Sequence, residues 1–346
     1  MMGRTKLKLS TEVKQMTIKI TEPGLFTTVQ DLGRRGYESY GFSPAGAMDY
    51  RSYCLANALV GNDFTKATIE MTFQGIQFTV LKKTTIATAG ASMNLTVNNQ
   101  PYRIGTIIDL DKGDQVVFGS VESGVRTYVA FTGGLDLPSE LGSYATHTRS
   151  GIGGYKGRVL QSGDILKTIG GHADIPLLEV DEAIETHEVE EIRVILGQES
   201  ERFNTEYQNL FKSSEYTVSK DTDRMGARLE GPAIKSDNGH DILSAPTQFG
   251  SIQIPKNGQP IILLADRQTA GGYTKIATVA KVDLPKIAQK QPGDKIRFKE
   301  ISIESASALY KESLEQLQNK VDLVPSKDFE AVRRTDANSV SKLIGG

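Results

Sequence analysis

The chain has 346 residues, with 40 Lys and Arg against 42 Asp and Glu, for a net charge of -2. This balance gives no electrostatic case for a nucleic acid or an anionic membrane as a partner, and no apolar run approaches the ~20 residues of a membrane span. The single cysteine, Cys54, excludes an intrachain disulfide, and the four histidines show no metal-ligand spacing, so we expect no metal site.

The chain begins with a polar, basic segment. Its first fifteen residues lack the apolar stretch of a signal peptide. We therefore expect residues 1–16 to be a disordered extension and the protein to be cytoplasmic. The remaining length has room for two domains with buried cores.

Most of the chain up to residue 300 consists of short β-branched and aromatic runs bounded by glycine, which is typical of strands. A Gly-Asp pair precedes three of these runs. Because glycine allows unusual backbone angles and aspartate caps the turn, each pair predicts a strand start in a β-rich barrel or sandwich. The expected strands are 76–81, 84–89, 116–118, 126–131, 192–196, 252–254, 260–264 and 276–279, and the Gly-Asp pairs stand at 113–114, 163–164 and 293–294.

Helices are expected at only four places. Asp49 can N-cap a helix over residues 50–60, and Gly61 can end it. Short helices are predicted over 206–212 and 284–289. Apolar residues at helical spacing predict a longer amphipathic helix over 302–320.

An acidic stretch, Glu179–Glu191, separates two strand-rich regions. Such a run is typical of a solvated linker, so we place a domain boundary near residues 175–195. The expected organisation is an N-terminal β-barrel domain over 17–185, a C-terminal β-barrel domain over 186–300, and an amphipathic helix with a polar tail over 301–346.

The densest polar segment, Asp266–Lys275, follows the apolar strand at 260–264. It combines an acid, two bases, an amide and hydroxyl groups with a Gly-Gly hinge, and loops of this kind on a rigid scaffold often carry function. We predict that Arg267 and Lys275 are catalytic and stabilise developing charge. In the simpler alternative, Asp266 and Arg267 pair with each other or with neighbouring residues. The substrate-binding residues predicted in this loop are Gln268, Thr269 and Tyr273.

A second polar segment precedes the 50–60 helix. Its arginines, Arg34 and Arg35, either hold a carboxylate or phosphate through paired N–H donors or form a solvated pair. Asp49 is predicted to cap the helix and is also a candidate catalytic acid. The further predicted substrate-binding residues are Gln30, Arg34, Ser43 and, from a separate segment that would face the same cleft, Arg224.

Several chemistries find no motif in the chain. It has no Walker-type phosphate loop and no biotinylation motif, and no serine or cysteine stands beside a histidine as in a hydrolytic triad. The glycine-rich segment Gly151–Gly157 lacks dinucleotide-binding spacing. It is either a tight crossing between strands or an anion-binding loop with Lys156 and Arg158.

Ordered blocks along the chain carry a family resemblance. The Asp266–Ala277 block, Asp-Arg-Gln-Thr-x-Gly-Gly-Tyr-x-Lys-Ile-Ala, resembles the signature of the biotin-dependent carboxyltransferase family. Together the blocks cover about residues 17–299. The other matching blocks are Val29–Gly36, Gly46–Asp49, Leu55–Asn62, Gly153–Arg158 and Asp223–Gly231.

The resemblance implies a mainly β protein of two cyclophilin-like β-barrel domains with few helices. It also implies the role of the C-type subunit of an ATP-dependent 5-oxoprolinase, which opens 5-oxo-L-proline to L-glutamate together with A-type and B-type subunits. ATP would then act at the level of the complex, and the chain alone would be inactive.

Two alternatives remain open within the family. One is a carboxyltransferase that acts on urea or another amide with carboxybiotin supplied by a partner. The other is a non-catalytic regulator that binds a kinase-inhibitor protein, which is the same kind of protein as the B-type subunit. The sequence does not separate these roles.

Overall fold

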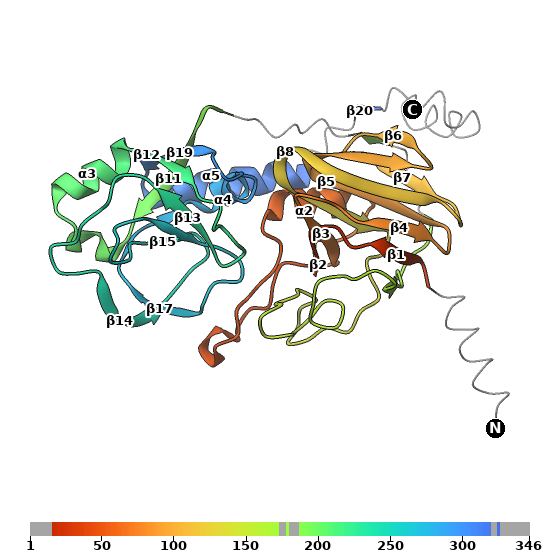
Figure 1. Cartoon of the computed structure of the whole chain (residues 1–346), viewed down its shortest axis with the longest axis horizontal. Coiled ribbons are helices and arrows are strands. Elements are labelled where there is room, and N and C mark those ends of the chain that lie inside the picture. The colour runs from red at the N-terminus through yellow and green to blue at the C-terminus, as the bar shows by residue number, and fades with distance from the viewer. Residues whose placement is uncertain (1–15, 173–177, 180–186, 320–323, 326–346) are drawn as a thin grey trace.

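The computed structural model describes residues 16–172, 178–179, 187–319 and 324–325. It has two lobes side by side, an N-terminal lobe of residues 16–172 and a C-terminal lobe of residues 187–300 (Figure 1). Strands account for 39% and helices for 17% of the structure. The prediction of a mainly β protein with few helices is therefore confirmed. The predicted extension at 1–16 and the polar tail lie almost wholly outside the described residues.

The N-terminal lobe is built on one curled sheet of nine strands. Its path runs β2-β3-β8-β4-β1-β9, and β5 joins it through β8 and carries β6 and β7. The long strands β5 and β8 pair over most of their length, and the described strands do not close into a barrel. The strands are β1 (Ile18–Glu22), β2 (Phe26–Gln30), β3 (Thr68–Thr72), β4 (Gln77–Val80), β5 (Thr84–Val97), β6 (Gln100–Tyr102), β7 (Ile107–Leu110), β8 (Gln115–Phe131) and β9 (Ile165–Leu166).

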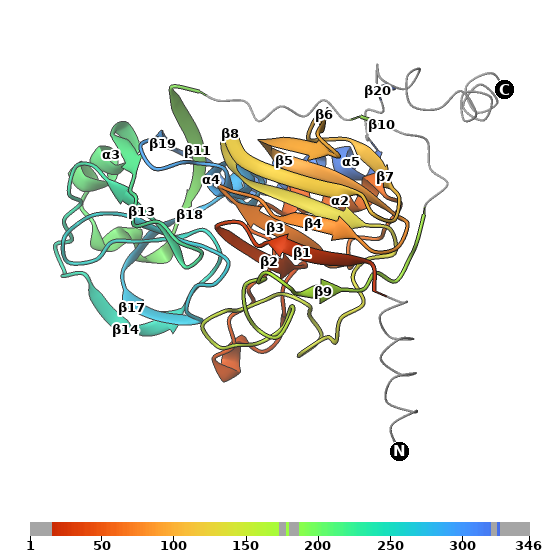
Figure 2. The same cartoon turned by 45° about the vertical axis from the view of Figure 1, so that its right-hand side comes forward.

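The C-terminal lobe contains a closed seven-stranded barrel in the order β11-β18-β15-β16-β13-β12-β19. A two-stranded ribbon of β14 and β17 projects beside it (Figures 1 and 2), with Leu243 93% exposed. The strands are β11 (Val189–Leu196), β12 (Glu215–Val218), β13 (Gly226–Glu230), β14 (Asp241–Pro246), β15 (Ser251–Gln253), β16 (Ile261–Leu263), β17 (Ala270–Tyr273), β18 (Lys275–Val279) and β19 (Lys295–Glu300); a separate pair is β10 (Leu178–Glu179) with β20 (Val324–Pro325).

All four predicted helices are present. Asp49 caps α2 by accepting from the backbone N–H groups of Arg51 and Ser52, and α5 contacts α2 of one lobe and the η3 turn of the other. No described helix has the length and apolar character to cross a bilayer. The helices are α2 (Tyr50–Leu59), α3 (Thr205–Ser213), α4 (Leu284–Ala288) and α5 (Ile303–Asn319), with 3-10 turns η1 (Glu38–Tyr40), η2 (Gln198–Arg202) and η3 (Lys281–Asp283).

The three Gly-Asp turns share one geometry. In each, the aspartate carboxylate accepts the backbone N–H of the residue three positions earlier, at 2.7 to 2.8 Å, and the glycine has a positive φ. Each turn leads directly into a strand, β8, β9 or β19. The local pattern therefore predicted these strand starts correctly.

The lobes have separate cores that meet at one point. Met48, from the N-terminal lobe, is fully buried in the apolar cluster of the C-terminal barrel. The two lobes are thus held together by an interior contact.

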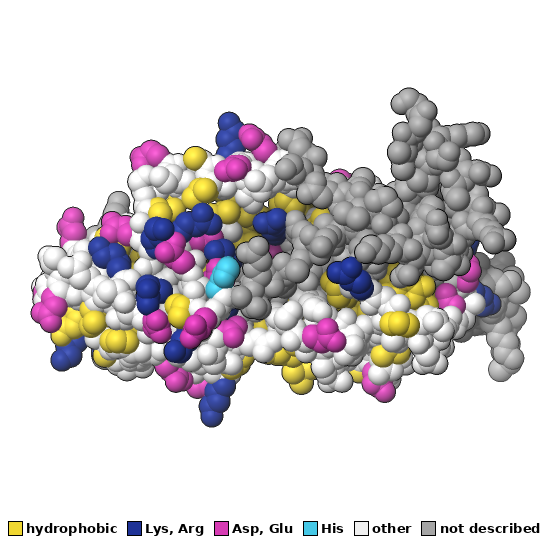
Figure 3. Space-filling model, turned by 90° about the horizontal axis from the view of Figure 1, so that it is seen from above, with side chains coloured by type: hydrophobic (Ala, Val, Ile, Leu, Met, Phe, Trp, Pro, Cys, Tyr) yellow, Lys and Arg dark blue, Asp and Glu magenta, His cyan; other side chains and the backbone are white. Residues whose placement is uncertain are grey.

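On the outer surface, basic and acidic side chains are interspersed over the described part of the face seen in Figure 3.

The acidic stretch is only partly as predicted. The expected boundary falls mostly on residues outside the described ones. However, β11 begins at Val189, and Glu190 is buried and pairs with Lys286 and Lys290 at 2.7 and 3.2 Å. The end of the stretch is therefore a barrel strand rather than a solvated linker, because two lysines of the α4 segment neutralise its buried carboxylate.

Candidate functional site between the two lobes

Arg224 is the centre of the contact between the lobes. It stands in the turn before β13, where Asp223 accepts the backbone N–H groups of Met225 and Gly226. Its guanidinium donates to both oxygens of Asp266 at 2.9 Å, to Glu70 and to the Gly46 carbonyl at 2.7 Å. One side chain of the C-terminal lobe thus binds two segments of the N-terminal lobe.

These contacts keep Arg224 ionised. Burial alone would lower the pKa of Arg224, but the carboxylates of Asp266 and Glu70 raise it above its ordinary value. Arg224 is therefore a positive charge matched by two buried negative charges.

The cluster continues into a chain of buried hydrogen bonds. Glu70, on β3, accepts the Met48 backbone N–H at 2.9 Å and the Tyr128 hydroxyl at 2.6 Å. The Tyr128 oxygen in turn accepts the Asp49 backbone N–H at 2.9 Å. Burial, with Glu70 and Asp49 nearby, raises the pKa of Tyr128, so its hydroxyl remains a donor to Glu70.

Gln289, just after α4, connects this chain to β8. Its amide group donates to Asp49 at 2.8 Å and to the Arg126 carbonyl at 3.0 Å, and its oxygen accepts the backbone N–H groups of Val125 and Arg126. Burial raises the pKa of Asp49, although hydrogen bonds from Ser52 and Gln289 oppose the shift. With its carboxylate occupied by helix and amide donors, Asp49 is a cap and a link between lobes.

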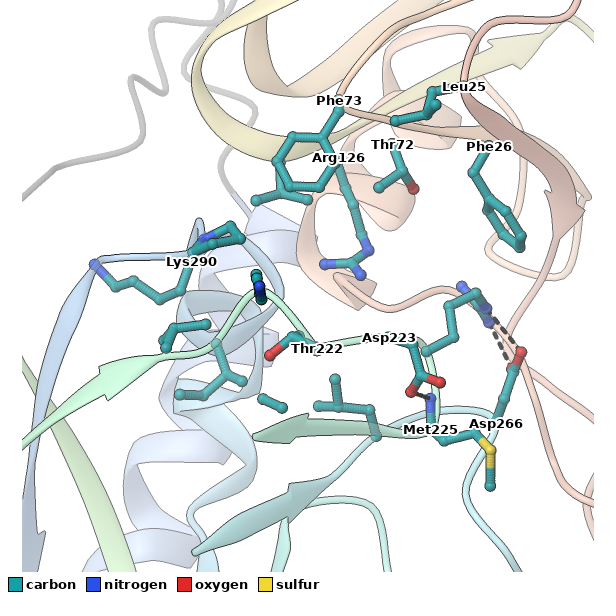
Figure 4. Close-up of a pocket in the computed structure, with 18 of the residues that line it drawn as sticks. Leu25, Phe26, Thr72, Phe73, Arg126, Thr222, Asp223, Met225, Asp266 and Lys290 are labelled. Carbon is teal, nitrogen blue, oxygen red and sulfur yellow. Dashed lines mark hydrogen bonds and ion pairs between the residues drawn. The ribbon is translucent and has the colours of Figure 1, made fainter. Parts of the chain in front are cut away.

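A cavity of about 310 Å³ lies beside this cluster, between the lobes. Figure 4 shows Leu25, Phe73 and Arg126 of the N-terminal lobe on one side and Thr222, Asp223 and Met225 on the other. The volume lies at the lower end of the ~300–1,000 Å³ range of small-molecule sites. The arrangement therefore suits a small ligand.

Arg126 is the least compensated charge of the cavity. It is 6% exposed and its side chain extends from β8 toward the cavity (Figure 4). One terminal nitrogen donates to the Ala288 carbonyl, whereas Nε has no hydrogen-bond partner and no carboxylate lies within ion-pair distance among the described residues. Burial lowers the pKa of Arg126, with Glu70 only partly opposing it.

Phe73, beside Arg126, has a strained backbone. Its φ is 62°, and the Gln74 N–H donates to the Thr72 carbonyl at 2.7 Å across it, so the three residues form a γ-turn. This turn is rare and costly for a bulky residue. Strained backbone of this kind clusters at functional sites, which supports the cavity as one.

On the other flank, the predicted residues of the 30–49 segment approach the Asp266 loop. The Ser43 hydroxyl donates to the Ala265 carbonyl at 3.2 Å. Gln30 is fully buried and uses its amide on Thr28, the Thr146 carbonyl and the Gly46 N–H. Gln30 thus holds the backbone of two other segments, at Gly46 and Thr146, against its own strand, and its assignment to substrate binding stays a prediction.

The two adjacent arginines predicted as a pair differ in environment. Arg35 is exposed, whereas Arg34 is buried and donates to the Ala145 carbonyl at 2.7 Å. Burial lowers the pKa of Arg34, while Asp31 and Glu140 oppose the shift. The two arginines therefore do not form a joint anion-binding pair, and Arg34 alone faces the interior.

Arg267 keeps the character expected of a functional residue. It is 9% exposed, its Nε has no partner, and no ion pair involves it among the described residues. Burial lowers its pKa, with Glu38 opposing the shift. Asp266 pairs with Arg224 instead, so the simple pairing of Asp266 with Arg267 does not form.

The rest of the predicted loop is spread out. Gln268 is exposed, Thr269 is half-buried, and Tyr273 is 40% exposed on the β17 ribbon. Lys275 pairs with Glu199 of η2 at 2.9 Å, and no described hydrogen bond or ion pair joins it to the N-terminal lobe. The structure thus groups Ser43, Arg224 and Asp266 but does not draw Lys275 into the same contact.

The glycine-rich segment packs tightly. A Cβ on Gly153 would lie 2.1 Å from the Ala145 carbonyl oxygen and 2.7 Å from an Arg34 nitrogen. Arg158 forms a two-point pair with Asp164 at 2.7 and 2.8 Å. These contacts favour a tight crossing of segments over an anion-binding loop.

One histidine contact was missed from the sequence. His147 Nδ1 and the Ser150 hydroxyl are 2.9 Å apart within a single turn, although no serine beside a histidine was expected. No acidic side chain hydrogen-bonds to His147 among the described residues, so a triad is not assembled there. The only cysteine, Cys54, is no better a nucleophile, because burial raises its pKa to about 12.

The sequence prediction also missed the buried partners in the contact between lobes. Glu70 and Arg126 are charged residues beside apolar strand neighbours, and that irregularity is a usable signal because an unpaired buried charge is costly. Gln289 is followed by Lys290 and Gln291 and gives no such signal. The missed residues are Glu70, Arg126, Tyr128 and Gln289. No group of three or more His, Cys, Asp or Glu arranged for a metal occurs in the described ranges.

Comparison with known families defines the class of protein. The family model described as "Carboxyltransferase domain, subdomain A and B" matches residues 40–300. The chain therefore belongs to the carboxyltransferase family. The resemblance found in the sequence blocks is confirmed.

Individual relatives narrow the comparison. The chain is 35% identical to the C-type subunit of 5-oxoprolinase from Escherichia coli, over 84% of this chain and 93% of that protein. It is 34% identical to the Haemophilus influenzae protein of the same name, over 85% and 96%. It also matches the urea amidolyase of Saccharomyces cerevisiae at 32% identity, over 97% of this chain but 19% of that protein.

A solved structure shares the fold. The K. lactis urea amidolyase superposes with a TM-score of 0.83 at 29% identity, over 91% of this chain and 20% of that one. The match spans both lobes. The arrangement of the two lobes is therefore shared with that protein.

Proposed function

We propose that this chain is the C-type subunit of an ATP-dependent 5-oxoprolinase and works with A-type and B-type subunits. The observation that carries the proposal is the match to two 5-oxoprolinase subunits along 93% and 96% of their length. The matches also cover 84% and 85% of this chain.

The site supports a role in charge stabilisation. Arg267 is buried and without an ion pair among the described residues, and a preorganised donor of this kind stabilises charge that develops in a transition state. In the proposed reaction, ATP phosphorylates the lactam oxygen. ADP leaves, a first water attacks the activated carbon, and the ring C–N bond breaks to give the acyl phosphate of glutamate. A second water then hydrolyses this acyl phosphate to glutamate and phosphate. ATP would bind at the level of the complex.

A second candidate is favoured by a separate observation. The match to urea amidolyase extends over 97% of this chain. Under this alternative the site would transfer a carboxyl group from carboxybiotin, supplied by a partner, to urea or another amide.

Reconstitution separates the two candidates. The full chain is mixed with A-type and B-type subunits, and ADP release is measured with 5-oxoproline or with urea. We expect 5-oxoproline-dependent turnover only when all three proteins are present. Turnover without this chain, or turnover only with urea and a biotinylated carrier, would overturn the proposal.

A further inference from the structure

The cavity between the lobes is strongly basic. Its lining includes five basic residues and two acidic ones, the basic ones being Arg126, Arg149, Lys220, Arg224 and Lys290 and the acidic ones Asp223 and Asp266. Two of the five cations are matched: Arg224 by Asp266 and Glu70, and Lys290 by Glu190 at 3.2 Å. Three cations remain without an ion pair among the described residues.

Arg126 is the unmatched cation that lies deepest. A buried charge with no partner is unfavourable because water no longer solvates it. Arg224, nearby, adds further repulsion. A negatively charged ligand group in the cavity would remove both costs and would also give the guanidinium a two-point hydrogen-bond partner.

The other two unmatched cations stand where a ligand would enter. Arg149 and Lys220 are exposed, and each lines the cavity. Charges of one sign at the mouth of a cleft raise the local concentration of oppositely charged ligands. The cations at the mouth and the cation in the interior therefore both favour a negatively charged ligand.

The remaining wall is apolar. Phe26, Phe73, Leu264, Ile287 and Pro292 contribute to it. A bare inorganic ion would leave this surface without a contact, whereas an aliphatic ring would cover it. The wall thus favours an anionic group attached to a small hydrocarbon body.

We propose that this cavity binds a small oxyanion, with Arg126 as its anchor, and that the oxyanion is the carboxylate of a small ring-shaped substrate whose body packs on the Phe73 wall. The assignment of that substrate as 5-oxoproline rests on the proposed function. Bicarbonate and phosphate share the oxyanion chemistry and are the other source to be tested.

Calorimetric titration of the full chain tests the anchor without turnover. The ligands are 5-oxoproline, 2-pyrrolidinone (the same lactam without the carboxylate), bicarbonate and phosphate. We expect 2-pyrrolidinone to bind at least roughly tenfold more weakly than 5-oxoproline, because a hydrogen bond to a charged group is lost. Arg126→Gln should weaken the binding of 5-oxoproline roughly tenfold to hundredfold and leave the binding of 2-pyrrolidinone unchanged.

Two variants serve as controls. Arg297→Gln removes an exposed arginine that pairs with Glu215 and does not line the cavity, so it should leave binding unchanged. If Arg126→Gln melts early, Lys220→Met keeps the test open, because loss of an exposed cation at the mouth should weaken 5-oxoproline in low salt but not in high salt.

The outcomes are distinct. Equal binding of 5-oxoproline and 2-pyrrolidinone, or binding that does not depend on Arg126, would contradict the proposal that Arg126 binds the carboxylate of the ligand. Tighter binding of bicarbonate or phosphate than of 5-oxoproline, lost in Arg126→Gln, supports the oxyanion site and assigns it to an inorganic ion. Because no ATP is present, failure of the reconstituted reaction would remove the proposed function and leave this binding result intact.

Discussion

Arg224 and Arg126 lie in neighbouring parts of the contact between the lobes and are equally buried, at 7% and 6% exposure. Arg224 binds two carboxylates and a carbonyl, and its pKa is raised. Arg126 binds one carbonyl, and burial lowers its pKa. A paired buried cation joins structural elements, whereas an unpaired one is held ready for a ligand that supplies the missing charge.

The largest expected effect is on the paired side of this comparison. Arg224→Met should destabilise the chain by about 3–5 kcal/mol, because it leaves Glu70 and Asp266 buried without their cation. Urea denaturation measures the change, with Arg297→Met as a surface control. A loss below about 1 kcal/mol, the range of a surface ion pair, would show that the cluster does not hold the lobes together.

A second test concerns Arg267, which is also buried and has no ion pair among the described residues. Arg267→Gln should fold normally and reduce turnover of the reconstituted complex by about a hundredfold, the scale of one lost charge-stabilising donor. The measurements are the melting temperature and kcat on one preparation. A variant that loses stability but keeps kcat would place Arg267 with Arg224 among the structural arginines.

Lys275 belongs on the paired side, because it has a carboxylate partner. Its ion pair with Glu199 is largely buried, with side-chain exposures of 15% and 25%, so Lys275→Ala should destabilise the chain by about 1–3 kcal/mol and keep most of the turnover. Glu199→Gln provides the matched control and should have a similar effect. A fall in kcat of about a hundredfold with the Lys275 variant alone would instead support the catalytic role predicted from the sequence.

The smallest effect concerns pH. Because the pKa of Asp49 is raised in the folded state, the folded chain binds this proton more tightly than the unfolded chain. Stability from this group therefore falls as pH rises from the unfolded pKa toward the folded one. Asp49→Asn, which can still cap the helix, should flatten that part of the curve. An unchanged curve from denaturation at several pH values would contradict the assignment.

Local features were predictable from the sequence. Asp49 and Gly61 predicted the bounds of α2, and the Gly-Asp pairs predicted three strand starts, because caps and turns depend on residues within a few positions. The site was less predictable. Arg224 meets Asp266 across 42 positions in its own lobe and Glu70 across 154 in the other lobe, and such pairing depends on how the barrel folds and how the lobes pack.

Lys275 illustrates the opposite difficulty, because residues that are close in the sequence need not lie close together in the fold. Its place in the same polar block as Arg267 suggested a shared site, but the ribbon strand β17 lies between them in the chain, and Lys275 begins the barrel strand β18, where it pairs with Glu199. Nearness in sequence does not fix the direction of side chains across strands. Arg126 was hidden for a related reason, since it stands at the head of the apolar 126–131 run and only the fold shows the cavity it faces.

The central claim is that Arg126 serves a ligand and Arg224 serves the fold. The most direct measurement compares steady-state kinetics and melting of the reconstituted complex with wild-type chain and with Arg126→Gln. The account predicts a KM for 5-oxoproline raised roughly tenfold to hundredfold with the melting temperature nearly unchanged. An unchanged KM together with a stability loss as large as that of Arg224→Met would contradict it.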